Sequence, residues 1–297
     1  SSTGQEIFTL VCEYPRAIHA QLLTHRVFSK NSSSSRAVPI KTAIEQVRTN
    51  PAKYVWTLNQ AGMQGEVLTS ENDTRIVEKL MNTYREQAIT NTEQLANFGI
   101  HKQNAGRLLE PYQNIKIVLT STEWKNWDWL RIDGAAQGEI KELAEAIYEA
   151  RMNADIMELG VNEWHVPFVQ RCRTEDEAGI LEYFIADGSG SGQYLTTEEA
   201  VQVSMSVCAQ TSYRKLDCSL EKAKRINDVL FNGNKVHASP SEHQCTPIPE
   251  FNKNDGRYCR WPKGVTHVSR DHSYWSGNFR NFIQNRQLLP NHDKELF

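Results

Sequence analysis

The sequence lacks several features that would restrict the class of protein. No run of about 18 or more apolar residues occurs in its 297 residues, so we expect no membrane-spanning helix. The net charge of -3 provides no broad basic surface for nucleic acid, although it leaves room for a local basic pocket that holds one phosphorylated molecule. The N-terminal stretch SSTGQEIFTL lacks the charged and then apolar layout of a signal peptide. We therefore expect a cytoplasmic protein with neither a nucleic acid nor a membrane as partner.

The six cysteines form no C-x-x-C pair, and their spacing suits neither a zinc ribbon nor a compact disulfide framework. Oxidised frameworks concentrate in small secreted domains, so we expect reduced thiols. His237 and His243 lie six positions apart and would not share one face of a helix, so we expect no metal site.

Two common catalytic motifs are also missing. Residues 187–195, DGSGSGQYL, follow an expected strand, but their glycines are spaced G-x-G-x-G and no helix begins directly after them. The dinucleotide fingerprint requires G-x-G-x-x-G leading into a helix, so this stretch predicts a hairpin or a mobile loop. The sequence contains no G-x-S-x-G motif of the serine hydrolases.

The pattern of apolar residues predicts an α+β fold with helix in excess, in which long helices accompany a mixed sheet. We expect one intertwined domain over residues 1–297, with 156–195 and 246–297 as unassigned insertions or extensions. Residues 52–68 look irregular. The expected strands are 6–14, 114–122, 163–170 and 179–187, and the expected helices are 15–26, 39–49, 72–97, 133–155, 197–210, 220–231 and 278–289.

Residues 22–40, LLTHRVFSKNSSSSRAVPI, contain four consecutive serines between Arg26 and Arg36. A solvated loop is one interpretation of such a run. However, the segment contains no glycine, and it leads into a helix that opens at Pro39, where free N–H groups favour an anion. A phosphate cradle is therefore the other interpretation.

Three further candidates each allow two readings. Residues 236–244, VHASPSEHQ, could be a Ser-Pro turn that caps a helix or part of a binding site. Arg107 and Arg131 each lie among apolar residues, where an unpaired guanidinium is costly. A buried ion pair or a bound ligand would explain either arginine.

Taken together, four motifs resemble those of the flavin-dependent thymidylate synthases. The family signature is a glutamine three residues before R-H-R, followed by S-x-N-E-x-S-x-R, and here residues 21–26 read QLLTHR and 29–36 read SKNSSSSR. The family motif H-x-S/T-P-F-E-H is similar to HASPSEH at 237–243, and C-A-R-V-S is similar to CAQTS at 208–212. An arginine followed by L-R-x-x-x-x-A-Q-x-E-I is similar to Arg107 and residues 130–140, LRIDGAAQGEI.

The resemblance covers roughly residues 5–155 and 198–245, in an unusual order. Most of the family carries the C-A-R-V-S and H-x-S-P-F-E-H motifs before R-H-R, whereas here they follow it, as in a circular permutation. The order predicts that residues 236–245 pack beside residues 6–36. It is similar to versions carried by bacterial viruses, which would place the protein in a bacterial or virus-infected host cytosol.

The resemblance implies an α+β fold and a homotetramer with shared active sites. It implies transfer of a one-carbon unit from methylenetetrahydrofolate to C5 of a pyrimidine deoxynucleoside monophosphate, converting dUMP to dTMP, with hydride from reduced FAD and with NADPH reducing the flavin. No cysteine nucleophile is needed, and no Pro-Cys motif occurs. By this resemblance FAD is bound by Ser212, His237, Ser239, Glu242, His25, Arg26 and Asn31; the nucleotide is held by Gln21, Ser32, Ser34, Arg36, Arg107 and Arg131; and Arg131, Gln21 and Ser34 are catalytic.

Several positions depart from the family motifs, and the N-A-R segment expected before Asn126 reads TSTEW. Thr24 stands for the first arginine of R-H-R, Ser32 for the glutamate, and Ser241 for the phenylalanine of S-P-F-E-H. Losing a carboxylate near a pyrimidine could change the choice between uracil and cytosine, which differ at C4. The alternatives are therefore a dCMP methylase or hydroxymethylase that makes modified DNA precursors, and a non-catalytic relative that binds flavin or nucleotide.

Overall fold

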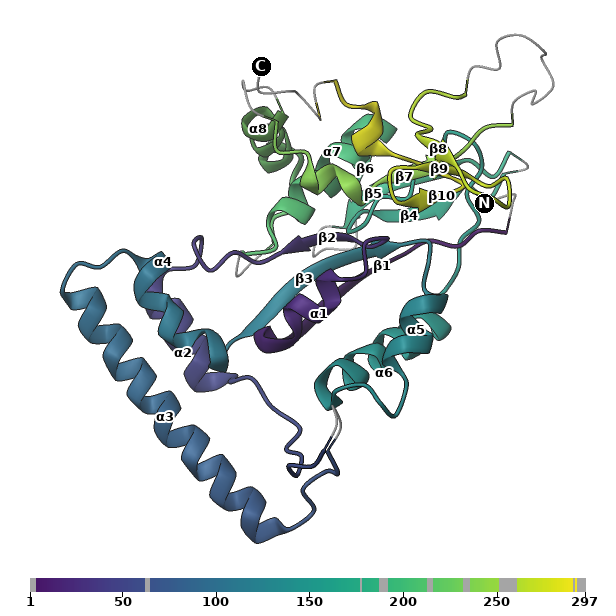
Figure 1. Ribbon diagram of the computed structural model, residues 1–297. Helices are drawn as coiled ribbons and strands as arrows, with labels where there is room; N and C mark the ends of the chain where they lie inside the picture. Colours follow the sequence, from purple (N-terminus) through teal and green to yellow (C-terminus); the bar gives the residue numbers. More distant parts are fainter. Residues whose placement is uncertain are drawn as a thin grey trace, which may run out of the picture.

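The central sheet has three antiparallel strands in the order β1-β3-β2 (Figure 1). They are β1 (Phe8–Pro15), β3 (Asn114–Ser121) and β2 (Ser29–Ser32). Thr120 of β3 pairs with Thr9 on one side and with Ser29 on the other. The computed structural model describes residues 4–61, 65–176, 178–186, 192–212, 216–231, 236–250, 261–290 and 292.

Alternation along the strands gives this sheet one apolar face and one polar face. Leu10, Cys12 and Tyr14 of β1, with Ile115, Ile117 and Leu119 of β3, turn to the apolar face and join a core of buried side chains. Residues at the intervening positions, including Thr9 and Thr120, form the polar face, on which the large cleft described below opens. The apolar face is covered by α1 (His19–Leu23), α5 (Lys125–Arg131) and α6 (Gly138–Met152), which lie together below the sheet in Figure 1.

A second group of helices extends from one end of the sheet (Figure 1). Their bounds are α2 (Ile40–Thr49), α3 (Glu71–Asn97), α4 (Lys102–Ala105) and the 3-10 helix η2 (Gly106–Tyr112). The side chain of Ser70 accepts a hydrogen bond from the backbone of Asp73 and so caps α3. A small core around Val47, Ile89 and Leu109 joins the three longer elements.

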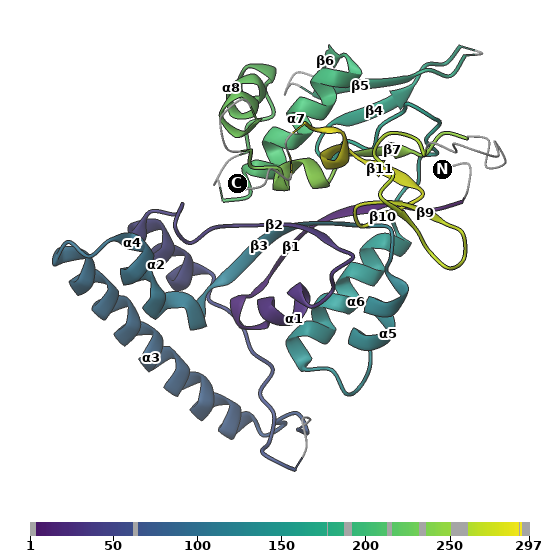
Figure 2. The ribbon, with the colours of Figure 1, turned by 45° about the horizontal axis from the view of Figure 1, so that its top comes forward.

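The remaining elements lie over the polar face of the central sheet (Figure 2). One sheet consists of β4 (Gln170–Arg173), β5 (Leu181–Ala186) and β6 (Gly192–Leu195), and another of β8 (His267–Val268), β9 (Tyr274–Ser276) and β10 (Phe279–Arg280). The strands β7 (Cys245–Pro247) and β11 (Phe282–Gln284) form a pair. The helices are α7 (Thr197–Ala209) and α8 (Leu220–Phe231), with the 3-10 helices η3 (Ser239–Glu242) and η4 (Asn285–Leu288). A separate core, with Val203, Phe279 and Phe282 at its centre, holds them together.

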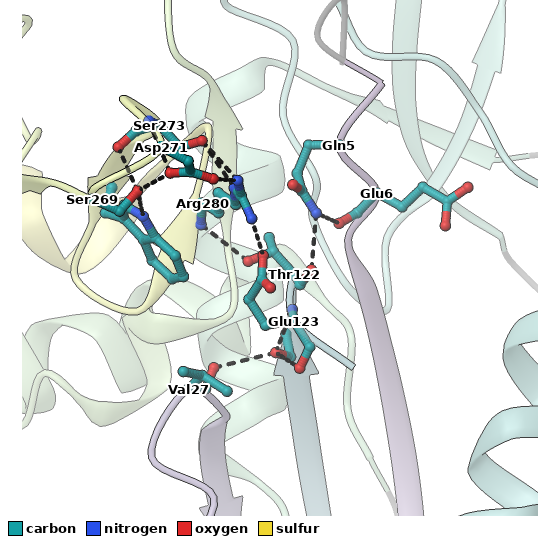
Figure 3. A network of polar contacts seen from close by, with 11 residues as sticks. Gln5, Glu6, Val27, Thr122, Glu123, Ser269, Asp271, Ser273 and Arg280 are labelled. Carbon is teal, nitrogen blue, oxygen red and sulfur yellow. Dashed lines mark hydrogen bonds and ion pairs between the residues drawn. The ribbon is translucent and has the colours of Figure 1, made fainter. Parts of the chain in front are cut away.

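An ion-pair network fastens the β9–β10 hairpin to the end of β3 (Figure 3). The Arg280 guanidinium lies between the carboxylates of Asp271 and Glu123. The Arg280 backbone N–H also donates to Thr122 Oγ1 at 3.0 Å. The C-terminal hairpin is thereby tied to the polar end of the central sheet.

The α+β class is confirmed, and most of the expected elements are present. The capping box of Thr196 and Glu199 forms as expected, and Ser219 caps α8. However, every strand pair among the described residues is antiparallel, so four small antiparallel sheets take the place of the expected mixed sheet. The strands β5 and β6 form a hairpin across residues 187–191, which lie outside the described residues.

Two expected elements were wrong. The strand predicted at 163–170 begins only at Gln170, because Phe168 has a φ of 68°, which an extended strand does not accommodate. The helix predicted at 278–289 is replaced by β10, β11 and η4, since Asn281 has a φ of 57° and separates the two strands.

Within the described part of the chain, no helix is both long and apolar enough to cross a membrane, and no group of three or more His, Cys, Asp or Glu residues is arranged to hold a metal. The expected thiols are free at Cys12, Cys172, Cys208, Cys218 and Cys245. Cys259 lies outside the described residues.

Candidate active site

Asn31, at the polar end of β2, joins three of the motifs. Its Nδ2 donates to the carbonyl oxygen of Cys208 at 2.7 Å, and its Oδ1 accepts from Ser239 Oγ at 2.5 Å. Three residues further on, the Ser34 N–H donates to Ser212 Oγ at 2.7 Å. The predicted packing of residues 236–245 beside residues 6–36 is therefore confirmed.

A cleft of about 590 Å³ opens beside this junction. Its floor is formed by Glu13 of β1 and Lys116 of β3, and Ser212 lies on the side of α7. The serine segment and one side of α2 form the other wall. The hydroxyl-bearing residues that line it are Ser33, Thr42, Thr49, Thr211 and Ser212.

The lining of the cleft is rich in hydroxyl and amide groups. The cleft runs along one side of the ten-residue helix α2, because Thr42, Gln46 and Thr49, spaced along the helix, all line it. Lys116 adds a cation, although Glu13 lies opposite it. The edge strand β2 ends at Ser32, and the chain continues into this wall at Ser33, so the phosphate cradle stays a prediction.

Arg131 lies in a second cluster, at the end of α5. Its Nε donates to His25 Nε2 at 3.1 Å, and its Nη2 lies 3.4 Å from Thr24 Oγ1 and 3.5 Å from the carbonyl oxygen of Gln21. Within the described residues, Nη1 of Arg131 has no hydrogen-bond partner, so its N–H groups can donate to a ligand. The cluster contains no carboxylate, so a bound ligand could supply the negative charge that Arg131 attracts.

His25 is held as a neutral acceptor for Arg131. Burial, together with the positive charges of Arg131 and Lys30, lowers the pKa of His25 to about 4. Phe28 stacks on the imidazole, and Trp127 meets it edge-on at a ring-centroid distance of 4.7 Å. Because Nε2 accepts from Arg131, the proton of the neutral ring resides on Nδ1.

Gln21 reaches across to the start of α6. Its Nε2 donates to Gln137 Oε1 at 2.6 Å. The Thr24 hydroxyl, which stands where the family has arginine, donates to the Gln21 carbonyl at 2.7 Å. A short polar turn thus replaces the second cation that would otherwise lie beside Arg131.

The structure gives the other predicted site residues different surroundings. The side chains of Arg26, Arg36 and His237 are exposed, while Arg107 forms an ion pair with Glu110 at 3.1 Å. Glu242 pairs with Arg286 of η4. Gly106, next to Arg107, lines a small hollow together with Ser33 and Ser34, so Arg107 lies at the edge of the serine segment without contacting it.

A buried polar layer beneath the site was not anticipated from the sequence. A chain of hydrogen bonds runs from His165 through Thr9 and Thr120 to His243, with distances of 2.8, 2.7 and 2.8 Å. Burial lowers the pKa of His165 and of His243 to about 3, so both rings are neutral at pH 7. The alternation of Thr9 with apolar neighbours was the only sequence signal for this layer.

Gln284 of β11 is the other unanticipated residue. Its Nε2 lies within hydrogen-bonding distance of Ser29 Oγ, the carbonyl of Glu242 and Asn278 Oδ1, at 3.0, 2.9 and 2.8 Å. It therefore ties β2 to the end of η3. No local motif marks a glutamine for this role.

Comparison with known proteins bears on this arrangement. The family described as thymidylate synthase complementing protein matches residues 4–154, which is half of the chain and includes both β2 and the Arg131 cluster. The chain belongs to this family. The family is flavin-dependent and uses a folate, and the expectation of a thymidylate synthase-like methyltransferase is confirmed at the level of the family.

Two crystal structures are similar over 49% of this chain, each with a TM-score of 0.40. Both are of a UMP/dUMP methylase PolB from Streptomyces cacaoi, one bound with 5-Br dUMP and the other with 5-Br UMP, at 22% and 21% identity. The similar part spans 66% and 67% of those chains. No curated protein matches the sequence.

The residues around the large cleft fit a phosphate-bearing cofactor such as FAD. Ser34, Ser212, Asn31 and Ser239 form a set of hydroxyl and amide groups next to the cleft, and Ser212 lines it. These are the donor types that bind pyrophosphate and ribose oxygens.

Proposed function

We propose that this protein transfers a one-carbon unit from methylenetetrahydrofolate to C5 of a pyrimidine deoxynucleoside monophosphate, with dUMP as substrate and dTMP as product. FAD, when bound and reduced, would supply the hydride that completes the methyl group, and NADPH would regenerate it. The observation that carries the proposal is Arg131 held by His25 in a chain that belongs to this family.

Arg131 would bind the substrate in this proposal. Its Nε is occupied by neutral His25 and its Nη2 by Thr24 and Gln21, so the orientation of the guanidinium is fixed before a ligand arrives. Such preorganisation lowers the entropic cost of binding. Nη1 remains to donate to an oxygen of the pyrimidine, which would stabilise negative charge as the ring is activated.

The large cleft would hold the phosphate-bearing part of a ligand. Its serine wall offers Ser33, Ser34 lines the small neighbouring hollow, and Arg36 follows on the same segment. FAD contacts by Ser212, His237, Ser239, Glu242, His25, Arg26 and Asn31, and nucleotide contacts by Ser32, Ser34, Arg36 and Arg107, remain part of the proposal. So does a homotetramer with shared active sites, in which exposed Arg36 and Arg107 could reach a second subunit's site.

One observation favours a second candidate substrate. Thr24 and Ser32 replace an arginine and a glutamate, and Thr24 contacts Arg131 directly. A changed charge beside the arginine that would bind the pyrimidine could favour an amino group at C4 over a carbonyl. The second candidate is therefore methylation or hydroxymethylation of dCMP.

Product analysis by mass spectrometry tests both candidates. The protein is incubated without oxygen with FAD, NADPH and methylenetetrahydrofolate, and with dUMP or dCMP in separate tubes. We expect a product about 14 mass units heavier than dUMP, because transfer of the one-carbon unit and its reduction add one CH₂ in total. A product from dCMP alone would move the function to modified precursors, and no product with flavin still bound would indicate a non-catalytic relative.

Arg131→Ala and Arg75→Ala form a matched pair for this assay. Arg131→Ala should lower kcat/KM at least about 100-fold, because it removes charged hydrogen bonds in the transition state. Arg75 is exposed on α3, and its position in the sequence is distant from the residues of the site. Its removal should therefore leave turnover unchanged.

A further inference from the structure

Arg171 lines two hollows at the end of β1 opposite the large cleft. The first, of about 470 Å³, includes Phe8 and Thr9 of β1, whereas the large cleft reaches Glu13 at the other end of that strand. The second hollow, of about 420 Å³, includes Val169 and Phe184. Arg171 and residues 155–157 belong to both hollows and lie between them.

Arg171 has no partner within the protein as far as the structure describes it. No described carboxylate forms an ion pair with Arg171, and no described group accepts a hydrogen bond from its guanidinium. Arg173, two positions along the same strand, differs in this respect. It donates to both carboxylate oxygens of Glu163 and to the carbonyl of Gly179.

The unpaired guanidinium is also partly buried. Desolvation by burial lowers the pKa of Arg171, and no carboxylate offsets this effect. An arginine remains charged even so, because its ordinary pKa lies far above neutral pH. Its nitrogen atoms still reach water, because none of them is among the fully buried atoms that lack a partner. The carboxylate of a ligand could replace this water and supply the counter-charge that the protein does not provide.

The two hollows differ in the charge of their lining. The larger one contains three acidic side chains, Glu6, Asp155 and Glu158, which would repel an anion. The smaller one contains Asp155 alone, whose exposed carboxylate forms no ion pair with Arg171. The rest of its lining is apolar apart from one amide: Ile156, Met157, Val169, Phe184 and Gln170.

We propose that the smaller hollow binds a compact organic anion, with its carboxylate on Arg171 and its apolar body against Ile156, Met157 and Phe184. The planar guanidinium presents paired donors that match a carboxylate in a bidentate arrangement. The amide of Gln170 adds a polar contact at the rim. This site lies outside the motifs of the proposed reaction, and it does not depend on that reaction.

Benzoate and benzamide are suitable probes, because they share one shape and differ in charge. Binding is measured by isothermal titration calorimetry on the full-length protein as purified, with neither nucleotide nor folate added. We expect benzoate to bind and benzamide to bind at least about tenfold more weakly, since a hydrogen bond to a charged group contributes a factor of this size. Equal binding of the two probes, or no binding of benzoate, would overturn the proposal.

Arg171→Gln and Arg75→Gln supply the matched variants. Arg171→Gln should weaken benzoate binding roughly tenfold to hundredfold, whereas Arg75→Gln on exposed α3 should not change it. Without ligand, Arg171→Gln should leave Tm unchanged or raise it, because it removes an unpaired charge. A fall in Tm or a failure to fold would assign Arg171 a structural role and would contradict the site, as would an unchanged affinity for benzoate.

Discussion

His25 illustrates how a neighbouring group determines the state of a side chain. A histidine in water is partly protonated near neutral pH, but burial against Phe28 and Trp127 removes the water that would stabilise the charge. Arg131 disfavours protonation further and uses the lone pair on Nε2. A protonated His25 could not accept this hydrogen bond, so the orientation of Arg131 depends on the neutral ring.

The same reasoning at three histidines predicts how stability depends on pH. The pKa of His25 is about 4 and those of His165 and His243 are about 3 in the folded protein, whereas each is near 6.5 when unfolded. Below pH 6.5 the unfolded state therefore binds more protons, and the free energy of unfolding falls as the pH is lowered. The slope should approach about 1.4 kcal/mol per pH unit for each fully shifted histidine.

Urea unfolding between pH 4.5 and 7.5 measures this slope. Carboxylates whose pKa is lowered in the folded protein, such as Glu163, contribute little in this range, because the ordinary pKa of such a carboxylate is 4.5. The buffers should therefore range from about one pH unit above the ordinary pKa of histidine down to the ordinary pKa of the carboxylates. His165→Gln should lower the slope by the contribution of one histidine, about a quarter to a third, because the pKa of His19 is lowered as well. His267→Gln is the matched control, because His267 is exposed and stacks on Trp275. A slope that His165→Gln leaves unchanged would contradict the assignment.

At the scale of elements, the sequence predicts those helices and strands for which the local pattern of residues agrees with the contacts made in the folded protein. The helix α3 has a serine cap and ends just before Gly99, which has a φ of 82°. The strand β3 is rich in β-branched residues, and it pairs with β1 along its whole length and with β2 along part of it. For α3 and β3, the bounds expected from the local sequence therefore agree with the observed bounds to within one or two residues.

The C-terminal stretch shows why other elements could not be predicted. Phe279, Phe282 and Ile283 have the spacing of one helical face, which predicts a helix. In the structure Phe282 and Ile283 belong to β11, which pairs with β7 more than thirty positions earlier in the chain. The partner strand decides the conformation here, and no local window of sequence contains it.

The same distinction applies to the site. Asn31, Ser212 and Ser239 could be predicted because each lies in a motif, and the permuted order predicted that they meet. Lys116 and Gln284 could not, because each enters the site region through sheet pairing rather than through a neighbour in sequence.

The start of α6 offers a prediction about how the irregular segment 52–68 is held. A Cβ at Gly138 would lie 2.6 Å from Val55 Cβ, and the Val55 N–H donates to Glu139 Oε1 at 2.9 Å. Gly138→Ala should therefore destabilise the protein by about 1–3 kcal/mol through overpacking, although alanine favours a helix. Chemical unfolding monitored by circular dichroism measures the change.

Gly134→Ala is the control for that experiment. A Cβ at Gly134 would meet no atom within 4 Å, so this substitution should be neutral or stabilise the protein by up to about 1 kcal/mol. If both substitutions had the same effect, contact with Val55 would not be the reason for glycine at position 138.

At the scale of the whole molecule, the matched family region covers residues 4–154, yet the polar face of its sheet is completed by later residues. His165 and His243 contact Thr9 and Thr120, and Gln284 contacts Ser29. The later residues therefore both cover these groups and supply their hydrogen-bond partners. We therefore propose that the chain folds as one domain over 1–297 and unfolds in a single transition.

Gln284→Ala tests this coupling directly. The Gln284 side chain is 2% exposed and its amide serves acceptors on β2, η3 and the turn before β10. Its removal leaves buried acceptors unsatisfied, which costs about 1–3 kcal/mol for each group that finds no other partner. We expect a loss of at least about 2 kcal/mol, with fluorescence and circular dichroism still reporting one coincident transition.

Gln193→Ala provides the matched comparison, because Gln193 is exposed on β6 and its truncation should change stability by less than about 0.5 kcal/mol. Two separate transitions in Gln284→Ala would mean that the later residues form an independent unit beside the family region. The polar contacts across the sheet would then be a docking surface between two units, and the loss of flavin or nucleotide binding would follow the weaker transition alone.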